Sequence, residues 1–310
     1  NNKAVVLSSN YFADINDDIR VNMSYTGNIT KATIFDITDK SFPIIVRELY
    51  IEGNYINSRL VNNMAYLITF AQKGPYYSVD GYYNEEISSF ETRVKQTILK
   101  DWVPTYYDIV YENNTILANT GIICSTQSVL RPEFSRGITV TSIVSVNLND
   151  VKLQYDNASV VSDNITVYAS QENIYLAAYN WNYWYDWFSW SDPNSYKQYD
   201  NTAIYKFDIH TNPYKVAYVA SGTVDGYVLN QFSMDEENGF LRVATTNNTW
   251  QDLKNYLSVL KEIDGTLEIV GQIKDIAPTE RIYSARFSGD RGFIVTFRQT
   301  DPLFTIDLSN

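Results

Sequence analysis

Cysteine and histidine are almost absent from the sequence, which holds one of each, Cys124 and His210, among 310 residues. A single cysteine excludes an intrachain disulfide. One histidine excludes a metal site built from several histidines and makes any Ser-His-Asp triad depend on His210. That residue follows a strand-like stretch in "FDIHTNP", so we expect an exposed turn histidine. Cys124 lies in the apolar run "GIICST" without a basic neighbour, which favours a buried structural thiol.

Positive charge is also scarce. Lys and Arg total 24 against 36 Asp and Glu, which gives a net charge of −12 and a pI of about 4.6. The basic residues are scattered, which excludes nucleic acid as a partner. The sequence has no run of about 18 apolar residues and therefore predicts no membrane span in this chain. It also lacks a Gly-rich phosphate loop and a nucleophile elbow, and we expect neither enzymatic activity nor a bound cofactor.

Alternation of apolar and polar residues with a period of two dominates what is present. The alternating stretches are rich in β-branched and aromatic residues, and Gly, Asn, Asp or Pro bounds most of them. They are "KATIFDI" (31–37), "PIIVRELYI" (43–51), "MAYLITF" (64–70), "GITVTSIVSVNL" (137–148), "NITVYASQENIYLAAY" (164–179), "NTAIYKFDI" (201–209), "GFLRVATT" (239–246), "GFIVTF" (292–297) and "LFTIDL" (303–308). Short strands at this even spacing predict an all-β fold.

Two parts of the chain repeat one plan. Residues 32–70 and 203–245 each hold an apolar strand ending in Phe-Asp-Ile, a Pro-containing turn, a second strand ending near Gly, and two further strands. Residues 141–179 and 256–298 follow the plan more loosely. Four strands in roughly 40–50 residues is typical of a β-propeller, whose stacked blades bury each other's faces. We therefore predict a β-propeller of four-stranded blades, about four to six in this segment, rather than a β-sandwich.

Residues 72–136 do not fit the repeat. Within them, "NEEISSFETRVKQTILKDW" (84–102) has apolar residues at helical spacing, and Asn84 is a candidate N-cap. The apolar residues are Ile87, Phe90, Val94 and Ile98. We predict an insertion over 72–136 with a short helix inside it. Two arrangements stay open, a cap over one end of the propeller and an irregular blade with a long loop.

Three strings closely resemble the family of secreted archaeal and bacterial proteins with a β-propeller domain distantly related to WD40 repeats. They are "FDITDKSFPIIVRELYIEGNYINSRLVNNMAYLIT" (35–69), "SMDEENGFLRVATT" (233–246) and "ERIYSARFSGDRGFIVTFRQTDPLFTIDLSN" (280–310). The resemblance covers most of the chain and is weakest over 72–136. It implies the propeller fold, export from the cell, no assigned enzymatic activity, and further blades on both sides. We expect residues 1–310 to form a single propeller domain that is part of a larger propeller or a longer chain. The alternative is closure of the ring by pairing of the two terminal segments within one sheet.

Carboxylates cluster without a catalytic pattern. "DINDD" (14–18) and "DEEN" (235–238) offer oxygen ligands for Ca²⁺, yet neither has the spacing and central Gly of an EF-hand loop. We expect solvated turns at both places, with Ca²⁺ as the alternative. The sequence predicts no other metal site.

Two further sets of charged residues have a regular placement. Asp36, Asp208 and Asp307 recur at one point of their repeats, which indicates that each bonds the backbone of the following turn. The only local cluster of arginines consists of Arg281, Arg286 and Arg291. Because these arginines alternate with polar residues, we expect ion pairs on or between blades, and an anion site is the alternative.

Asn-x-Ser/Thr triplets, which are acceptors for N-glycosylation, occur at six positions. They are Asn22, Asn28, Asn113, Asn157, Asn164 and Asn247. Roughly four such triplets arise by chance in a chain this rich in Asn, so they give mild support to an extracellular or cell-surface location.

Four of the six tryptophans lie at every third position of "AAYNWNYWYDWFSWSDPNSY" (177–196). Read as a strand, this stretch carries aromatic side chains on both faces, and "SDPNS" is a turn, which together predict a long β-hairpin between two blades. The candidate binding residues are Trp181, Tyr183, Trp184, Tyr185, Trp187 and Trp190. One possibility is that the insertion covers them, and the other is that they form an exposed contact site.

Three functions stay open for the chain. The first is protein–protein contact or self-association through the aromatic hairpin, because Trp and Tyr are common interface anchors. The second is binding of a glycan by stacking on the same aromatic rings. The third is an uncharacterised hydrolase with carboxylates in a central channel. We expect the first, that of a non-enzymatic binding or structural module.

Overall fold

The computed structural model describes residues 2–11, 17, 19, 27–74, 87–112, 115–125, 128–131, 139–152, 155–162, 165–180, 200–212, 214–249, 252–297 and 302–309. The chain divides into two compact units. The first comprises residues 1–162 with 213–216, and the second comprises residues 163–212 with 217–310. The expectation of a single propeller domain over 1–310 stays a prediction.

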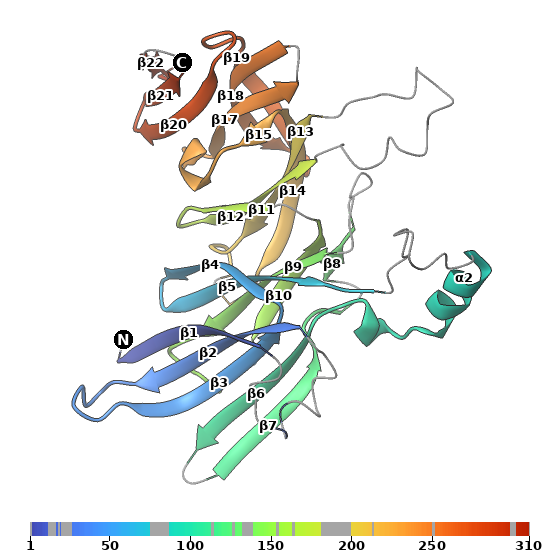
Figure 1. Ribbon diagram of the computed structural model, residues 1–310. Helices are drawn as coiled ribbons and strands as arrows, with labels where there is room; N and C mark the ends of the chain where they lie inside the picture. The colour runs from blue at the N-terminus through green and yellow to red at the C-terminus, as the bar shows by residue number, and fades with distance from the viewer. Residues whose placement is uncertain are drawn as a thin grey trace. The chain divides into compact units, whose positions relative to one another are not determined.

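The first unit holds two five-stranded sheets (Figure 1). The first sheet has the order β1-β2-β3-β6-β7, and all its neighbouring strands are antiparallel. The second has the order β4-β5-β9-β10-β8, in which the short β8 is parallel to β10. The strands are β1 (Lys3–Tyr11), β2 (Asn28–Asp36), β3 (Ile44–Glu52), β4 (Asn54–Val61), β5 (Met64–Gln72), β6 (Thr105–Glu112), β7 (Thr115–Ile122), β8 (Val129–Leu130), β9 (Thr139–Asn147) and β10 (Asp156–Val161).

The second unit holds a nine-stranded and a three-stranded sheet. The larger sheet consists of two antiparallel meanders, β11-β12-β13-β14 and β15-β17-β18-β19 with β16 also on β17, joined by one parallel bridge between Ser221 and Thr266. The smaller sheet has the order β20-β21-β22. The elements are β11 (Ile165–Ala169), β12 (Asn173–Asn180), β13 (Asn201–Asp208), β14 (Ala217–Asp225), β15 (Tyr227–Val228), the 3₁₀ turn η3 (Gln231–Ser233), β16 (Met234–Glu237), β17 (Phe240–Thr249), β18 (Asp252–Ile263), β19 (Thr266–Ile273), β20 (Arg281–Ser288), β21 (Arg291–Phe297) and β22 (Leu303–Asp307).

The described residues thus form four sheets, and one of these divides into two meanders, which makes five blade-like meanders. The prediction of an all-β fold built from consecutive antiparallel strands is confirmed. Five also falls within the expected range of about four to six.

The sequence repeat and the sheets are offset by two strands. The first repeat, residues 32–70, supplies β2 and β3 to one sheet and β4 and β5 to the next. Gly53 stands at the crossing with a φ of 120°, and a Cβ there would lie 2.5 Å from the Phe70 carbonyl oxygen. Gly226 stands at the same point of the second repeat with a φ of 78°, and a Cβ there would lie 2.5 Å from the Thr246 carbonyl oxygen. Only glycine meets both conditions, so the repeated Gly marks where the chain passes to the next meander.

The three recurring aspartates cap the turns that follow their strands, as predicted. Each accepts hydrogen bonds from backbone amides of the next turn. The donors are Thr38 for Asp36 (2.8 Å), His210 and Thr211 for Asp208 (2.7 and 2.9 Å) and Ser309 for Asp307 (3.1 Å). His210 is exposed within such a turn, which confirms that expectation. Asn147 does the same after β9, where it accepts from the amide of Asn149.

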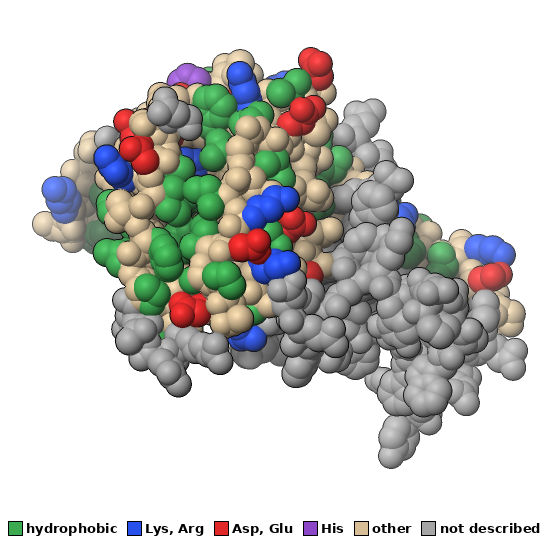
Figure 2. Space-filling model, turned by 90° about the horizontal axis from the view of Figure 1, so that it is seen from above, with side chains coloured by type: hydrophobic (Ala, Val, Ile, Leu, Met, Phe, Trp, Pro, Cys, Tyr) green, Lys and Arg blue, Asp and Glu red, His purple; other side chains and the backbone are tan. Residues whose placement is uncertain are grey.

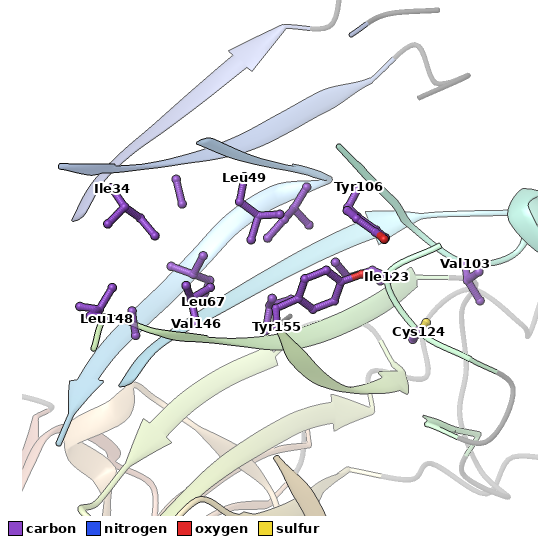
Figure 3. Close-up of a cluster of buried hydrophobic side chains, with 14 residues drawn as sticks. Ile34, Leu49, Leu67, Val103, Tyr106, Ile123, Cys124, Val146, Leu148 and Tyr155 are labelled. Carbon is purple, nitrogen blue, oxygen red and sulfur yellow. The ribbon is translucent and has the colours of Figure 1, made fainter. Parts of the chain in front are cut away.

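The core of the first unit lies between its two sheets (Figure 3). Ile34 and Leu49 of the first sheet and Leu67 and Val146 of the second are all buried in it. Cys124 lies in the same cluster. Burial raises the pKa of its thiol to about 11, and a hydrogen bond with Ser159 offsets part of that rise. The prediction of a buried structural thiol is confirmed.

The insertion carries the predicted helix, α2 (Ile87–Gln96), followed by the 3₁₀ turn η2 (Leu99–Asp101). Ile98, expected on the apolar face, instead lies beyond the helix end and is exposed, and Asn84 lies outside the described residues. The rest of the insertion includes the hairpin β6–β7, which pairs with β3 and extends the first sheet. No helix within the described ranges combines the length and apolar character needed to cross a membrane.

Candidate contact surface

The aromatic residues singled out from the sequence, Trp181, Tyr183, Trp184, Tyr185, Trp187 and Trp190, lie outside the described residues. The hairpin expected there therefore stays a prediction. Its two neighbours are described, since β12 ends at Asn180 and β13 begins at Asn201.

Three of the six glycosylation triplets fall in described strands, and Asn22, Asn113 and Asn164 do not. Asn28 is half-buried, and Thr30 of its triplet donates to the Gly53 carbonyl from inside the sheet. The triplet of Asn157 ends in Ser159, which is also buried. Asn247 is half-buried on β17. Glycosylation at all six positions stays a prediction.

The acidic stretch 235–238 uses its carboxylates to join neighbouring meanders. Glu236 accepts hydrogen bonds from Ser170 Oγ (2.5 Å), Asn173 Nδ2 (2.8 Å) and Tyr175 OH (2.8 Å), all of the β11–β12 hairpin. Burial and the nearby Glu236 carboxylate raise the pKa of Tyr175 well above its ordinary value. Within the described part of the chain, no group of three or more His, Cys, Asp or Glu side chains is close enough to hold a metal ion.

Arg242 makes the corresponding link from β17 to the last sheet. Its Nε donates to Asp235 at 3.0 Å, and its Nη1 donates to the Gly289 carbonyl at 2.6 Å. The guanidinium also lies over the Phe287 ring, 5.4 Å from the centroid. These contacts attach the β20–β21 turn to the preceding meander. The expectation of a solvated turn at 235–238 is therefore wrong for Asp235 and Glu236, which are half-buried on β16, because neighbouring strands supply donors to them. Most of the stretch 14–18 lies outside the described residues, and Ca²⁺ binding stays a prediction.

Described residues of the preceding meander cover one face of the β20–β22 sheet, and the described residues leave large apolar side chains exposed on the other face. On the covered face, Ile282, Ala285 and Ile294 are buried against Ala244 and Leu257 of the preceding meander. The opposite face is open and apolar at one end, and we call it the outer face of the last sheet. It includes Tyr283, which is 72% exposed, Phe297, which is 52% exposed, and Leu303. The Tyr283 and Phe297 rings lie 6.0 Å apart. Figure 2 looks onto the strands near the C-terminus, and hydrophobic side chains gather there among basic and acidic ones.

The three clustered arginines are all exposed on β20 and β21. Arg286 stacks over the Phe232 ring at 3.8 Å from the centroid, which joins β20 to the turn η3. Arg291 lies 3.8 Å from Asp307 of β22. Of the expected ion pairs, the structure shows one, between Arg291 and Asp307 within the last sheet. Arg286 instead makes a cation–π contact with the preceding meander.

An internal comparison shows what normally covers such a face. Phe240 of β17 and Arg291 of β21 are each the first residue after a two-residue hairpin turn, so Ala244 corresponds to Val295 and Thr246 to Phe297. Ala244 and Thr246 are buried beneath the β20–β22 sheet. Their counterparts Val295 and Phe297 are half-buried and exposed. The outer face therefore has the position of a face that a neighbouring sheet covers elsewhere in the same unit.

Sequence reasoning missed this surface. The run "GFIVTF" is apolar on both faces of β21, which signals a strand covered on both sides. The apolar character of both faces is present in the sequence, but the period-two pattern by itself predicts only that the run is a strand. The alternation pattern alone does not distinguish an apolar strand that is covered on both faces from one that has an open face.

A family model described as "Beta propeller domain" matches residues 1–310. This match confirms the predicted β-propeller fold and the resemblance to a propeller family. An uncharacterised protein of Methanocaldococcus jannaschii, MJ1554, is 40% identical over 115 residues, which are 37% of this chain and 18% of that protein. An uncharacterised protein of Archaeoglobus fulgidus is 46% identical over 114 residues, which are 37% of this chain and 17% of that protein.

Among solved structures, the acylaminoacyl peptidase of Pyrococcus horikoshii aligns over 100% of this chain and 51% of its own. The sequence identity is 11% and the TM-score is 0.26. A similarity at that level supports no functional comparison.

Proposed function

Because the chain belongs to the β-propeller domain family, we propose that it is a non-enzymatic, secreted or cell-surface module that works by protein–protein contact. The observation that carries the proposal is the outer face of the last sheet, where the described residues leave Tyr283, Phe297 and Leu303 exposed. Aromatic residues and Arg are enriched where proteins bind each other.

The internal comparison suggests what kind of partner fits. The face equivalent to this one, on β17, is covered by a β-sheet that contributes Ile282, Ala285 and Ile294. A partner that presents a flat apolar sheet matches the aromatic centre of this face. Burying Tyr283 and Phe297 removes two large apolar side chains from water, at about 1.5–3 kcal/mol for a fully buried side chain.

A non-enzymatic role is supported by how three buried or half-buried acids among the described residues are used. Glu52 binds Lys73 and Thr105, Asp108 binds Arg47, and Glu236 binds a hairpin. An acid or base in catalysis needs a substrate within hydrogen-bond reach. Each of these carboxylates instead holds one part of the fold against another.

The extracellular location rests on the family resemblance and on the six glycosylation triplets. The aromatic segment Trp181–Trp190 stays a second candidate for contact. A glycan would stack on the same aromatic rings as a protein, so the test must separate the two.

Site-specific photo-crosslinking tests the proposal. A photoreactive phenylalanine analogue replaces Tyr283 in one variant and Phe42 in another, because both aromatic side chains are 72% exposed and they lie in different units. In the cell-envelope and culture fractions of the producing organism, the Tyr283 probe is expected to form a discrete protein adduct and the Phe42 probe is not. Equal labelling at both positions, or no protein adduct at Tyr283, contradicts the proposal. Enrichment on a glycan array that is lost in Tyr283→Ser supports a carbohydrate ligand instead.

A further inference from the structure

The inserted hairpin β6–β7 is fixed to the first sheet by buried polar residues of β3. Arg47 donates two hydrogen bonds to Asp108, at 2.9 and 2.7 Å. Glu52 accepts from both the amide and the hydroxyl of Thr105, each at 2.8 Å. Arg47 and Glu52 are buried, so water does not compete for these contacts.

A third contact completes the attachment. Tyr111 OH donates to Glu48 at 2.6 Å, and Glu48 also pairs with Lys31 of the neighbouring strand β2. Burial first, and then the Glu48 carboxylate, raise the pKa of Tyr111 above its ordinary value. The three contacts lie along the whole length of β6. The hairpin is therefore a rigid addition to the sheet, and its outer strand β7 has a fixed position.

Strand β7 forms an edge of the sheet (Figure 1). Residues 115–120 are exposed on both faces, and Leu117 is 53% exposed. The register with β6 runs over eight residue pairs without a bulge. Among the described residues, β6 is the one strand paired with β7.

The composition of β7 sets it apart from other long edge strands. Its sequence, "TILANTGI", has no charged residue and no proline. The other described edge strands of eight or more residues carry charge: β1 has Lys3, β4 has Arg59, and β20 has Arg281 and Arg286. Natural proteins protect edge strands with charge, proline or bulges, because a bare edge pairs with another strand. The long edge strand β7 has none of these protections.

The backbone of β7 is oriented for pairing. The Ile123 amide donates to the Pro104 carbonyl at 2.7 Å, so these two residues form a hydrogen-bonded pair. Pairs alternate along an antiparallel ladder, which directs the amide and carbonyl groups of Ile116 and Ala118 away from β6. An added strand would bond to these two residues.

We propose that β7 pairs antiparallel with β7 of a second copy of this chain across a two-fold axis. This surface is distinct from the outer face of the last sheet, and the proposal is independent of the proposed function. With Leu117 on the axis, Leu117 lies opposite Leu117 of the second copy and Ile116 lies opposite its Ala118. The exposed apolar side chains then meet each other, and the outward amides meet carbonyls.

Charge favours a second copy at this place over other parts of the surface. Each chain carries a net charge of −12, so two copies repel each other in general. Strand β7 has no charged residue and so adds no like-charge repulsion of its own to a contact between two copies. Glu112, which lies opposite Thr115 at the end of β6, is paired with Lys152, and Asp108 of β6 is paired with Arg47. Screening of the remaining repulsion predicts that added salt strengthens the dimer.

Analytical ultracentrifugation of three proteins tests the pairing. The wild type is expected to dimerise reversibly, more tightly in 0.5 M than in ~0.05 M salt. Leu117→Lys places a charge on the axis and is expected to raise the dissociation constant at least about tenfold. Leu60→Lys is the matched control, because Leu60 is 68% exposed on the edge strand β4, and it is expected to dimerise like the wild type.

A second pair of variants separates pairing from folding. Ala118→Pro removes an amide that points away from β6, so the hairpin is retained and the dimer is lost. Leu117→Cys in a Cys124→Ala background is expected to form an intermolecular disulfide on mild oxidation, because opposed residues in an antiparallel ladder have Cα atoms about 4.5–5.5 Å apart. Thr115→Cys, two residues from the axis, is expected not to. A wild type that is monomeric at high concentration and salt overturns the proposal, as does a dimer that survives Leu117→Lys and Ala118→Pro.

Discussion

Arg47 of β3 and Asp108 of β6, which are 61 positions apart in the chain, form a two-point ion pair that is buried on the arginine side. Arg47 also donates to the Val151 carbonyl at 2.9 Å. When the carboxylate is removed, the buried guanidinium still carries the free-energy cost of its transfer out of water, and no partner charge offsets that cost. Arg47→Met and Asp108→Asn are each expected to lower the free energy of unfolding by about 3 kcal/mol, as measured by urea denaturation.

The same pair predicts a non-additive double variant. Arg47→Met combined with Asp108→Asn removes both charges and is expected to cost clearly less than the two single losses added together. Hydrogen exchange should show faster exchange over β6 and β7 in the single variants and little change in the second unit. Additive losses would mean that the two side chains act independently.

The glycines at the crossings between meanders give a second prediction. Gly226→Ala combines a positive φ with a Cβ 2.5 Å from the Thr246 backbone, so it is expected to lose more than about 1 kcal/mol of stability. Gly239→Ala is the control, because Gly239 has a φ of 79° but no atom within 4 Å of its Cβ position. It is expected to show only the conformational cost, roughly 1 kcal/mol. Equal losses in thermal and urea unfolding would show that close approach is not what requires glycine at 226.

Local and distant features of the fold differ in how far the sequence predicts them. The capping roles of Asp36, Asp208 and Asp307 were predictable because each bond spans two or three residues. The sequence identifies the glycine at each crossing as the end of a strand. It does not show that glycine is required there, because that requirement depends on which strands lie next to the crossing.

The polar residues of β3 show the same limit more clearly. Arg47, Glu48 and Glu52 stand among apolar residues, and charged residues in a strand are ordinarily expected to face solvent. They are buried because the insertion, more than 50 residues later, supplies Asp108, Tyr111 and Thr105. The outer face of the last sheet is the opposite case. Its residues are apolar, so the sequence predicts that they are buried, whereas the structure leaves several of them exposed.

Protonation of Asp36 gives a prediction about pH. Hydrogen bonds from Thr38 and the ammonium of Lys3 lower the pKa of Asp36 below its usual value. The folded state therefore binds this proton less readily than the unfolded state, whose pKa is about 3.9. The stabilisation is fully present above about pH 4 and is lost as the pH falls through the folded pKa. The stability difference between wild type and Asp36→Asn should narrow below about pH 4. A difference that stays constant down to about pH 2 would contradict this assignment.

Cys124 is expected to be unreactive in the folded protein. Its thiol is buried and has a pKa of about 11, so little reactive thiolate exists at neutral pH. Ellman's reagent at pH 8 should label it only as fast as the first unit unfolds, and fully in denaturant. Rapid labelling of the native protein would place the thiol near the surface.

Hydroxyl-radical footprinting, read by mass spectrometry, tests the central claim that the outer face of the last sheet is a protein-contact surface. The oxidation of Tyr283 and Phe297 is measured in the purified chain and in the producing cells, with Phe42 as the exposed reference. The account predicts that Tyr283 and Phe297 are oxidised several-fold less in cells, while Phe42 is oxidised equally in both. Equal oxidation of Tyr283 and Phe297 in the two samples would contradict it.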